Sequence, residues 1–508
     1  MKTDMKKYIL LFSLTMALTL AGCTGDLDQK PHAQDTAENI YSTQQGTFGA
    51  LTKIYASYVT TGQAKNGNND ITSNRGFDFM RCYINLQEGP TDEMAYSWLS
   101  GEVMTGLTFM TWDSSDPWIA DAYYRLYYTI ALANSFLKET ANSTIEGVGD
   151  YRNEARFLRA LAYYYVLDLY GKGAFVTEQT EAETPPCYRN SQLFAFIESE
   201  LKAVADDLPS RTQVIYGRAS RGAAYSLLAK MYLNAEVYDA GARYAECIEA
   251  CDKVIAEGYS LAPDYASLFN ADNDKRTEEI IFPFVIDATN TVTWGATTYL
   301  VCGAASGNTD QYGIASAWGN FRLRGEFVAL FDGFTTADKR YLIIKNDGGS
   351  TFTGNIDNTA EGYFGKKFTN LTDAGEAASN TATDGVNTDY PVFRFADILL
   401  MKAEATVRNG GDIEVARGLI KQIRDRAFGT STTIADWQLT LDEILKERTR
   451  EMWWECTRRT DLVRYGYFTS GSYLWQWKGG LLNGRGVDSS RNVYYIPLSE
   501  QEANENMR

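Results

Sequence analysis

The sequence predicts a mainly α-helical protein: a helical-repeat scaffold that carries a loop-rich, β-containing ligand-binding region. Helical periodicity of apolar residues dominates from about residue 120 to 258 and again from about 391 to 508. Between about 259 and 390 the composition shifts toward Gly, Thr, Asn and Asp, with short β-prone runs such as Ile280–Ile286. Binding residues usually lie on loops that a rigid scaffold positions. We therefore expect the ligand site in residues 259–390 and in a second loop-rich segment at about 60–118.

Amphipathic helices account for the scaffold. One face of Arg152–Tyr170, for example, holds Leu158, Leu161, Tyr165 and Leu169. Helices in antiparallel succession form hairpins, as in helical-repeat proteins, although no regular sequence period is visible. The predicted helices are Tyr123–Leu137, Arg152–Tyr170, Ser191–Asp207, Arg218–Asn234, Arg243–Ala256, Val392–Arg408, Ile413–Ala427 and Leu441–Cys456.

The N-terminus has the pattern of a bacterial lipoprotein signal peptide. Lys2, Lys6 and Lys7 form a positive region, and the apolar stretch Ile9–Leu20 follows. That stretch is too short to cross a bilayer as a helix, which needs about 20 residues, so it is typical of an export signal. Leu20–Cys23 matches the lipobox, which predicts a signal peptide at 1–22, lipidation of Cys23 and a mature domain at 23–508. The alternative is an ordinary signal peptide with a chance cysteine.

Charge and composition narrow the ligand class. The formal net charge is -17, which argues against nucleic acid as a partner, because a basic surface is its usual footprint. Attraction to an anionic membrane surface is disfavoured for the same reason. A neutral ligand is compatible with this charge. The 33 Tyr, 24 Phe and 10 Trp residues supply many rings that can either fill a core or face a ligand.

Few catalytic arrangements are available to this chain. Its single histidine, His32, follows the predicted anchor, which excludes Ser-His-Asp and Cys-His catalysis and His-based metal sites. Paired carboxylates remain possible, because sequence cannot give their separation. Glu447, Glu451 and Glu455 are spaced at i, i+4 among arginines, which is more simply explained as a helix with ion pairs.

Cysteines and acidic turns give weak metal signals. The six cysteines after Cys23 are dispersed without a CxxC motif, so buried free thiols are our expectation. Asp272 and Asp274 flank an asparagine, as in a fragment of a calcium loop, but an oxygen cage needs more ligands. An exposed acidic turn is the alternative. We predict no cofactor, with calcium at Asp272 and Asp274 as the one possible exception.

Several motifs distributed along the chain together resemble the SusD/RagB family. The resemblance implies a tetratricopeptide-like helical scaffold and an outer-membrane lipoprotein that acts as a lid on a SusC-like TonB-dependent transporter. In that family, acidic residues after the lipidated cysteine promote display on the cell surface, a role that Asp26 and Asp28 fit. The motifs are Glu154–Leu161, Asp168–Gly171, Gly217–Ala219, Phe393–Leu400, Ala403–Ala405, Glu447–Arg448, Asp461–Arg464 and Tyr495–Leu498.

Three further segments resemble the starch-binding branch of this family. They are Pro90–Glu93, Tyr299–Gly303 and Tyr473–Gly480. In that branch an arc of aromatic side chains cradles a curved α-glucan chain. The resemblance assigns the ligand-binding positions to Arg81, Tyr96, Trp98, Trp294 and Trp318.

Two departures from that branch affect the expected site. Tyr96 stands where a tryptophan is expected and Trp294 where a tyrosine is expected, so both positions keep a stacking face. Gly101 replaces an asparagine that contacts sugar hydroxyls, which removes one polar contact.

The chemistry of sugars supports the interpretation of these residues as ligand-binding. Pyranose rings present C–H faces that pack on aromatic planes, while their hydroxyls need polar partners, which the fork of Arg81 could supply. Each aromatic contact contributes on the order of 0.5–1.5 kcal/mol beyond area burial. The alternative is that the rings belong to the core, since tryptophan is usually largely buried. We expect Trp475 and Trp477 to be structural.

Three functions therefore remain open. The favoured one is a non-catalytic surface lipoprotein of the outer membrane that binds starch-type α-glucans and delivers them to the transporter. The second keeps the family role with another glycan or a peptide as cargo. The third is a glycoside hydrolase that uses two carboxylates.

Overall fold

The computed structural model describes residues 37–62, 69–72, 74–305, 307, 309–332, 337–345, 355–378 and 385–508. The predicted signal peptide, Cys23, Asp26, Asp28 and His32 lie outside these residues. Within the described ranges, no helix is both long enough and apolar enough to cross a membrane.

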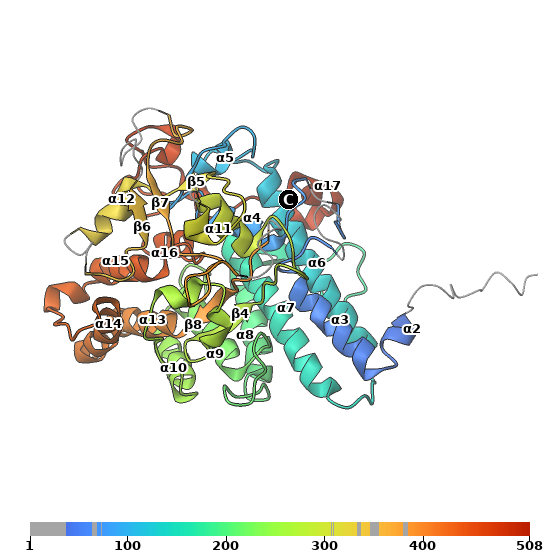
Figure 1. Cartoon of the computed structure of the whole chain (residues 1–508). Helices are drawn as coiled ribbons and strands as arrows, with labels where there is room; N and C mark the ends of the chain where they lie inside the picture. The colour runs from blue at the N-terminus through green and yellow to red at the C-terminus, as the bar shows by residue number, and fades with distance from the viewer. Residues whose placement is uncertain are drawn as a thin grey trace, which may run out of the picture.

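Helices make up the body of the molecule, which confirms the predicted mainly α fold (Figure 1). They pack in chain order, so that α6 lies on α7, α7 on α8, α8 on α9 and α9 on α10. The series continues through α13, which contacts α10, α14 and α15. The longer helices are α3 (Gln44–Ala56), α4 (Phe79–Gln87), α6 (Pro117–Glu139), α7 (Val148–Tyr170), α8 (Asn190–Val204), α9 (Arg221–Leu233), α10 (Tyr244–Ala256), α11 (Ala296–Ala304), α13 (Phe395–Arg408), α14 (Ile413–Phe428) and α15 (Leu441–Met452).

Local sequence explains where these helices begin and end. Asp116 caps α6, accepting hydrogen bonds from the backbone N–H groups of Trp118 and Ile119, and Pro117 occupies the first turn. Gly171 ends α7 in the left-handed conformation at φ 64°, which a glycine adopts without strain. All eight predicted helices are present. The sixth begins at Phe395 rather than Val392, because the preceding residues form a strand.

Four two-stranded antiparallel sheets occur in the described chain: β1 with β5, β2 with β3, β4 with β8 and β6 with β7. The strand predicted within Ile280–Ile286 is confirmed as β4. Short helices also occur, both inside and outside the predicted loop-rich segments. The bounds are β1 (Ala95–Tyr96), β2 (Lys172–Ala174), β3 (Cys187–Arg189), β4 (Ile280–Phe284), β5 (Phe321–Arg322), β6 (Ile343–Lys345), β7 (Tyr363–Gly365), β8 (Tyr390–Arg394), α2 (Ala37–Ile40), α5 (Thr105–Thr108), α12 (Gly325–Val328), α16 (Arg458–Arg464) and α17 (Leu498–Ala503).

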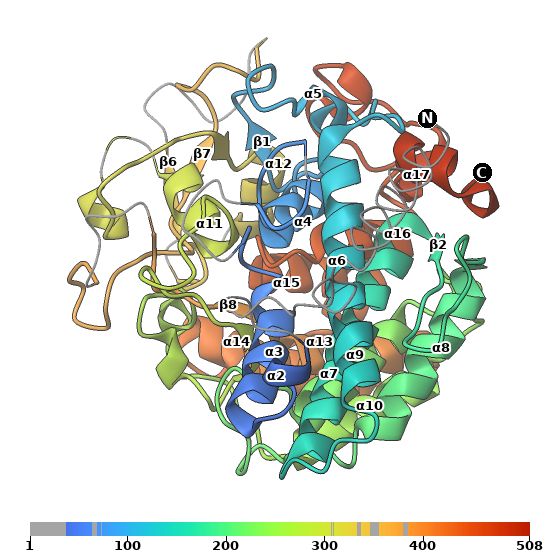
Figure 2. The ribbon, with the colours of Figure 1, turned by 90° about the vertical axis from the view of Figure 1, so that its right-hand side faces the viewer.

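The loop-rich elements gather at one end of the helical body. In both views, the long helices α8, α9 and α10 lie at one end of the molecule (Figures 1 and 2). The elements toward the opposite end and side are α5, α11, α12, β6 and β7. Segments near residue 100 and near residue 320, far apart in sequence, therefore come together.

Candidate functional site

The pairing of β1 with β5 brings two of the predicted ligand-binding residues together. Tyr96 is opposite Phe321 in the register, and the backbone N–H of Ser97 extends the ladder by donating to Asn320 O at 2.8 Å. Trp98 follows β1 and Trp318 precedes β5, so both rings lie at the same end of this sheet. The Trp98 side chain is 44% exposed, and Trp318 is half-buried.

Trp294 reaches the same region from the turn before α11. Its side chain is 44% exposed, and its carbonyl oxygen accepts a hydrogen bond of 2.8 Å from Arg81 Nη1. The Arg81 guanidinium carbon also lies 6.0 Å from the centroid of the Trp318 ring. We call Trp98, Trp294 and Trp318 the tryptophan platform. These three predicted residues have accessible rings, as a sugar contact requires.

The turn that carries Trp294 is anchored to the start of α4. Asp78 caps this helix, and its Oδ2 accepts a hydrogen bond of 2.6 Å from Thr293 Oγ1. A Cβ on Gly295 would lie 1.8 Å from Asp78 Oδ2, so only glycine permits this close approach. Burial raises the pKa of Asp78 above its usual value, although hydrogen bonds from Thr293 and Arg81 oppose the shift.

Tyr96 does not present the exposed stacking face that we expected. Its exposed fraction is 0%, and its hydroxyl accepts a hydrogen bond of 2.7 Å from Asn320 Nδ2. The side chain lies in the core because β1 is covered on the face to which Tyr96 points. Burial raises the pKa of the Tyr96 phenol. A direct sugar contact by Tyr96 stays a prediction and would require movement of this ring.

Arg81 faces the protein interior in this structure. Its guanidinium carbon lies 3.7 Å from the centroid of the Phe77 ring and 4.5 Å from that of Tyr299. Its Nη1 donates to Trp294 O, its Nη2 lies 3.2 Å from Glu102 Oε2, and its Nε is buried. Hydrogen-bond donation from Arg81 to sugar hydroxyls therefore stays a prediction. The structure shows Arg81 in contact with the turn that bears Trp294.

Sequence reasoning did not single out Glu102, Asp78 or Thr293. Glu102 joins Arg75 and Arg81, and its carbonyl oxygen accepts a hydrogen bond of 2.8 Å from Trp118 Nε1. The sequence did contain one signal for Glu102: it is a polar residue four positions, or one helical turn, after Trp98, which was expected to bind the ligand. Gly101 lies exposed beside it, and a Cβ there would have no atom within 4 Å.

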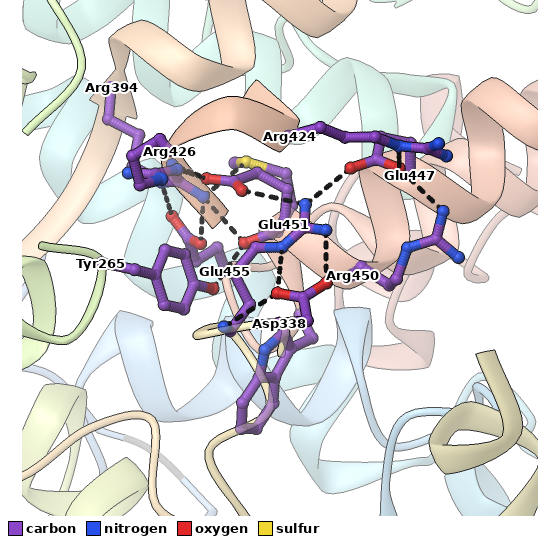
Figure 3. A network of polar contacts seen from close by, with 12 residues as sticks. Tyr265, Asp338, Arg394, Arg424, Arg426, Glu447, Arg450, Glu451 and Glu455 are labelled. Atoms are coloured by element: carbon purple, nitrogen blue, oxygen red, sulfur yellow. Dashed lines mark hydrogen bonds and ion pairs between the residues drawn. The ribbon is translucent and has the colours of Figure 1, made fainter. Parts of the chain in front are cut away.

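Glu447, Glu451 and Glu455 form a buried ion-pair network, as the structural interpretation predicted (Figure 3). Only Glu447 and Glu451 lie on α15, because the helix ends at Met452 and Glu455 follows it. Most of the partners come from other elements of the chain, such as Arg340 and Arg394. Burial alone would raise the pKa of Glu451, but Arg426, Arg394 and Arg340 outweigh it and hold the pKa at about 2. Such a group stays ionised and is a poor proton donor for glycoside cleavage.

A second carboxylate pair, Glu88 and Glu93, is sealed in the core. The side chains are 0% and 2% exposed, and they accept hydrogen bonds from the backbone N–H groups of Cys456 and Trp454. Burial raises the pKa of Glu93 to about 7, and burial with the charge of Glu93 raises that of Glu88. Their position gives a substrate no direct access.

The predicted calcium site gains no support from the described residues. Among them, no group of three or more His, Cys, Asp or Glu side chains is arranged to hold a metal ion. Asp272 Oδ1 instead lies 2.9 Å from Lys275 Nζ, and its Oδ2 accepts a hydrogen bond from the backbone of Asp373. These contacts fit the alternative of an acidic turn. The expected structural roles of Trp475 and Trp477 agree with their burial, which is nearly complete for Trp475 and partial for Trp477.

Comparisons with known proteins cover the whole chain. Residues 226–507 match the SusD family, and residues 47–233 match a family described as starch-binding and associating with the outer membrane. The chain is 33% identical to the starch-binding protein SusD of Bacteroides thetaiotaomicron, covering 100% of this chain and 99% of that protein. It is 24% identical to a SusD-like protein of Bacteroides ovatus, covering 94% of this chain and 87% of that protein.

Solved structures share the fold. A SusD-like carbohydrate-binding protein of Bacteroides fragilis aligns with a TM-score of 0.72 at 18% identity, covering 93% of this chain and 100% of that one. Surface glycan-binding protein A of Bacteroides thetaiotaomicron, in complex with laminarihexaose, aligns with a TM-score of 0.70 at 18% identity, covering 92% and 99%. The chain is 33% identical to SusD over its full length, and more than half of its residues match the SusD family. This chain therefore belongs to the SusD family.

Proposed function

We propose that this protein is a non-catalytic, cell-surface lipoprotein that binds starch-type α-glucans and delivers them to a SusC-like TonB-dependent transporter. The observation that carries the glycan-binding role is the tryptophan platform, whose three accessible rings come from separate segments of the chain. Aromatic faces of this kind pack against the C–H faces of pyranose rings. The chain is 33% identical, over its full length, to a protein named for starch binding, which supports an α-glucan as the cargo.

Weak capture is expected from this arrangement. Three aromatic contacts at on the order of 0.5–1.5 kcal/mol each give a few kcal/mol before the cost of ordering the ligand. Affinity in the micromolar-to-millimolar range suits a protein that must release its cargo to a transporter.

A second candidate cargo is a β-glucan, because a protein of the same fold was solved in complex with laminarihexaose. Isothermal titration with maltoheptaose and with laminarihexaose separates the two. Binding of maltoheptaose alone supports the first cargo, and binding of laminarihexaose alone supports the second. Absence of heat with both ligands up to millimolar concentration would contradict a glucan cargo and favour another glycan or a peptide.

The remaining parts of the proposal have separate tests. Incubation with amylose should release no new reducing ends, and their appearance would identify a hydrolase. Metabolic labelling with palmitate should mark the wild-type protein and not Cys23→Ala, which tests the lipid anchor. Protease accessibility on intact cells tests the exterior orientation. Co-purification of a TonB-dependent transporter from solubilised outer membranes tests the partner.

A further inference from the structure

The platform needs a polar partner for sugar hydroxyls. Rings alone leave hydroxyl groups without hydrogen bonds once water is displaced, which is unfavourable. Arg81 has both Nη atoms engaged with protein groups and its Nε buried. Gly101 has no side chain to offer. The Arg81 side chain is only 4% exposed, so a more accessible polar residue near the rings is better placed for this contact.

Glu102 lies on the segment of Trp98 and is connected to the other two platform segments through Arg81. Its backbone N–H donates to Trp98 O at 2.9 Å, so the two residues are the ends of a single helical turn. Side chains separated by four residues in such a turn share a face. Through Arg81, the Glu102 carboxylate is also one side chain away from Trp294 and Trp318.

The two oxygens of this carboxylate differ in their surroundings. Oε2 accepts hydrogen bonds from Arg75 Nη2 at 3.0 Å and from Arg81 Nη2 at 3.2 Å. No hydrogen bond to Oε1 is found among the residues that the structure describes, and the side chain is 19% exposed. The two arginines thus hold the carboxylate in place and leave one oxygen as a fixed acceptor at the surface. A fixed charged acceptor binds a hydroxyl donor without a large ordering cost.

We propose that Glu102 is the polar contact of the tryptophan platform, with Oε1 accepting a hydrogen bond from a hydroxyl of the bound glycan. The proposal rests on the proposed glycan-binding function. It assigns to Glu102 the hydroxyl recognition that Gly101 has lost. Arg75 and Arg81 then act as positioning residues, because they orient the carboxylate.

The test uses Glu102→Gln and β-cyclodextrins methylated at O2, at O3 or at O6. In the variant, the arginine donors require an oxygen, so the amide oxygen takes the place of Oε2 and the NH2 group faces the ligand. A methyl ether lacks the donor that Oε1 needs, but it still accepts a hydrogen bond from an NH2 group. Steric effects of the methyl group are the same in both proteins.

Titration calorimetry of the wild-type protein should show one position at which methylation weakens binding about tenfold or more, as for a hydrogen bond to a charged group. In Glu102→Gln, the penalty at that position should fall to a few-fold or less. The matched control is Glu178→Gln: Glu178 is 24% exposed and pairs with buried Arg159, as Glu102 pairs with buried Arg81. The control should retain the wild-type methylation penalties.

The outcomes separate the two proposals. If the methylation penalty at each of the three positions is the same in Glu102→Gln as in the wild-type protein, the role of Glu102 is overturned while glycan binding is left intact. Wild-type protein that binds neither β-cyclodextrin nor maltoheptaose nor laminarihexaose would contradict the proposed function, and the inference with it. Thermal unfolding of both variants establishes that binding is compared between folded proteins.

Discussion

Arg394 and Glu455 form a two-point contact in the core, with Nε 2.7 Å from Oε2 and Nη2 2.8 Å from Oε1. Arg394 ends β8 and also reaches Glu451 and Glu279 through Nη1. One guanidinium therefore links the strand that leads into α13 with Glu451 of α15 and with Glu455, which follows that helix. All of these side chains are buried.

Replacement of Arg394 should destabilise the fold strongly. Arg394→Met leaves Glu451, Glu455 and Glu279 short of positive charge in the interior, and breaking a buried ion pair in this way costs about 3–5 kcal/mol. Urea unfolding followed by circular dichroism measures the loss. Lys202→Met is the control, because Lys202 pairs with Glu198 at the surface, where such pairs contribute about 0–1 kcal/mol. Equal stability of the two variants would contradict a structural role for the network.

Removal of platform rings should weaken glycan binding without unfolding the protein. Trp98→Ala and Trp318→Ala should each reduce affinity roughly fivefold or more, since a stacked aromatic contact is worth about 1 kcal/mol. Calorimetric titration with the cognate oligosaccharide provides the measurement. Trp437→Ala is the control, because Trp437 is 64% exposed and lies in a different segment, before α15. Normal binding by both platform variants would place the site elsewhere.

Gly101→Asn should strengthen binding. The position is exposed with free space around it, so the amide adds hydrogen-bonding groups beside Trp98 without a clash. One additional hydrogen bond contributes about 0.5–1.5 kcal/mol, which is an affinity gain of roughly two- to tenfold. Gly101→Ala adds only a methyl group and should leave the affinity unchanged. No gain from asparagine would show that sugar hydroxyls do not reach this point.

Gly295→Ala should displace the turn that carries Trp294. The new Cβ would meet the Asp78 carboxylate, so either the capped start of α4 or the turn must move. Overpacking of this kind costs about 1–3 kcal/mol. We expect a lower Tm together with weaker glycan binding. A variant with wild-type values of both would show that the contact between Asp78 and the turn is easily rearranged.

The Glu88–Glu93 pair should make stability depend on pH. Burial holds the pKa of Glu93 at about 7 in the folded protein, whereas the unfolded chain releases this proton near the ordinary glutamic acid pKa of 4.5. The folded state binds more protons in this window, so the free energy of unfolding falls as pH rises through it. Arg458, 3.8 Å from Glu93, and Asp92 also face this carboxyl, and burial outweighs the attraction of Arg458.

Glu93→Gln should remove this contribution while keeping an acceptor for the Trp454 N–H. Urea unfolding between pH 5 and pH 8 should then show the variant gaining stability relative to wild type as pH rises. Asp116 and Asp389 also have raised pKa values but are present in both proteins, so the difference reports on Glu93 together with Glu88, whose pKa the charge of Glu93 raises. Parallel stability curves would mean that Glu93 is already ionised in the folded state.

Periodicity predicted the eight scaffold helices but missed α3, α4 and α11. Helices such as α14 bury one face and expose the other, so their apolar spacing is visible in the sequence. Every residue of α4 and of α11 is buried, which removes the contrast between faces, and neither helix was predicted. Both helices support the site directly, because α4 carries Arg81 and α11 follows Trp294.

The candidate site was predictable as a set of ring-bearing loops, but not in its details. Polar, Gly-rich surroundings favoured ligand contact for Trp98 and Trp318, and Trp98 is 44% exposed whereas Trp318 is half-buried. Burial of Tyr96 depends on pairing with β5, a strand more than two hundred residues away in the chain. The role of Glu102 likewise depends on Arg81 and Arg75 meeting one carboxylate, which spacing along the chain does not reveal.

The brevity of the β1–β5 ladder limits how this surface can diverge. Each strand has two residues, and neighbouring side chains along a strand point to opposite faces. A deletion or insertion of one residue between Tyr96 and Trp98, or between Trp318 and Phe321, would turn a ring away from its companions. Relatives with new ligand preferences are therefore expected to exchange side chains at these positions while conserving segment length, and to vary length only beyond them.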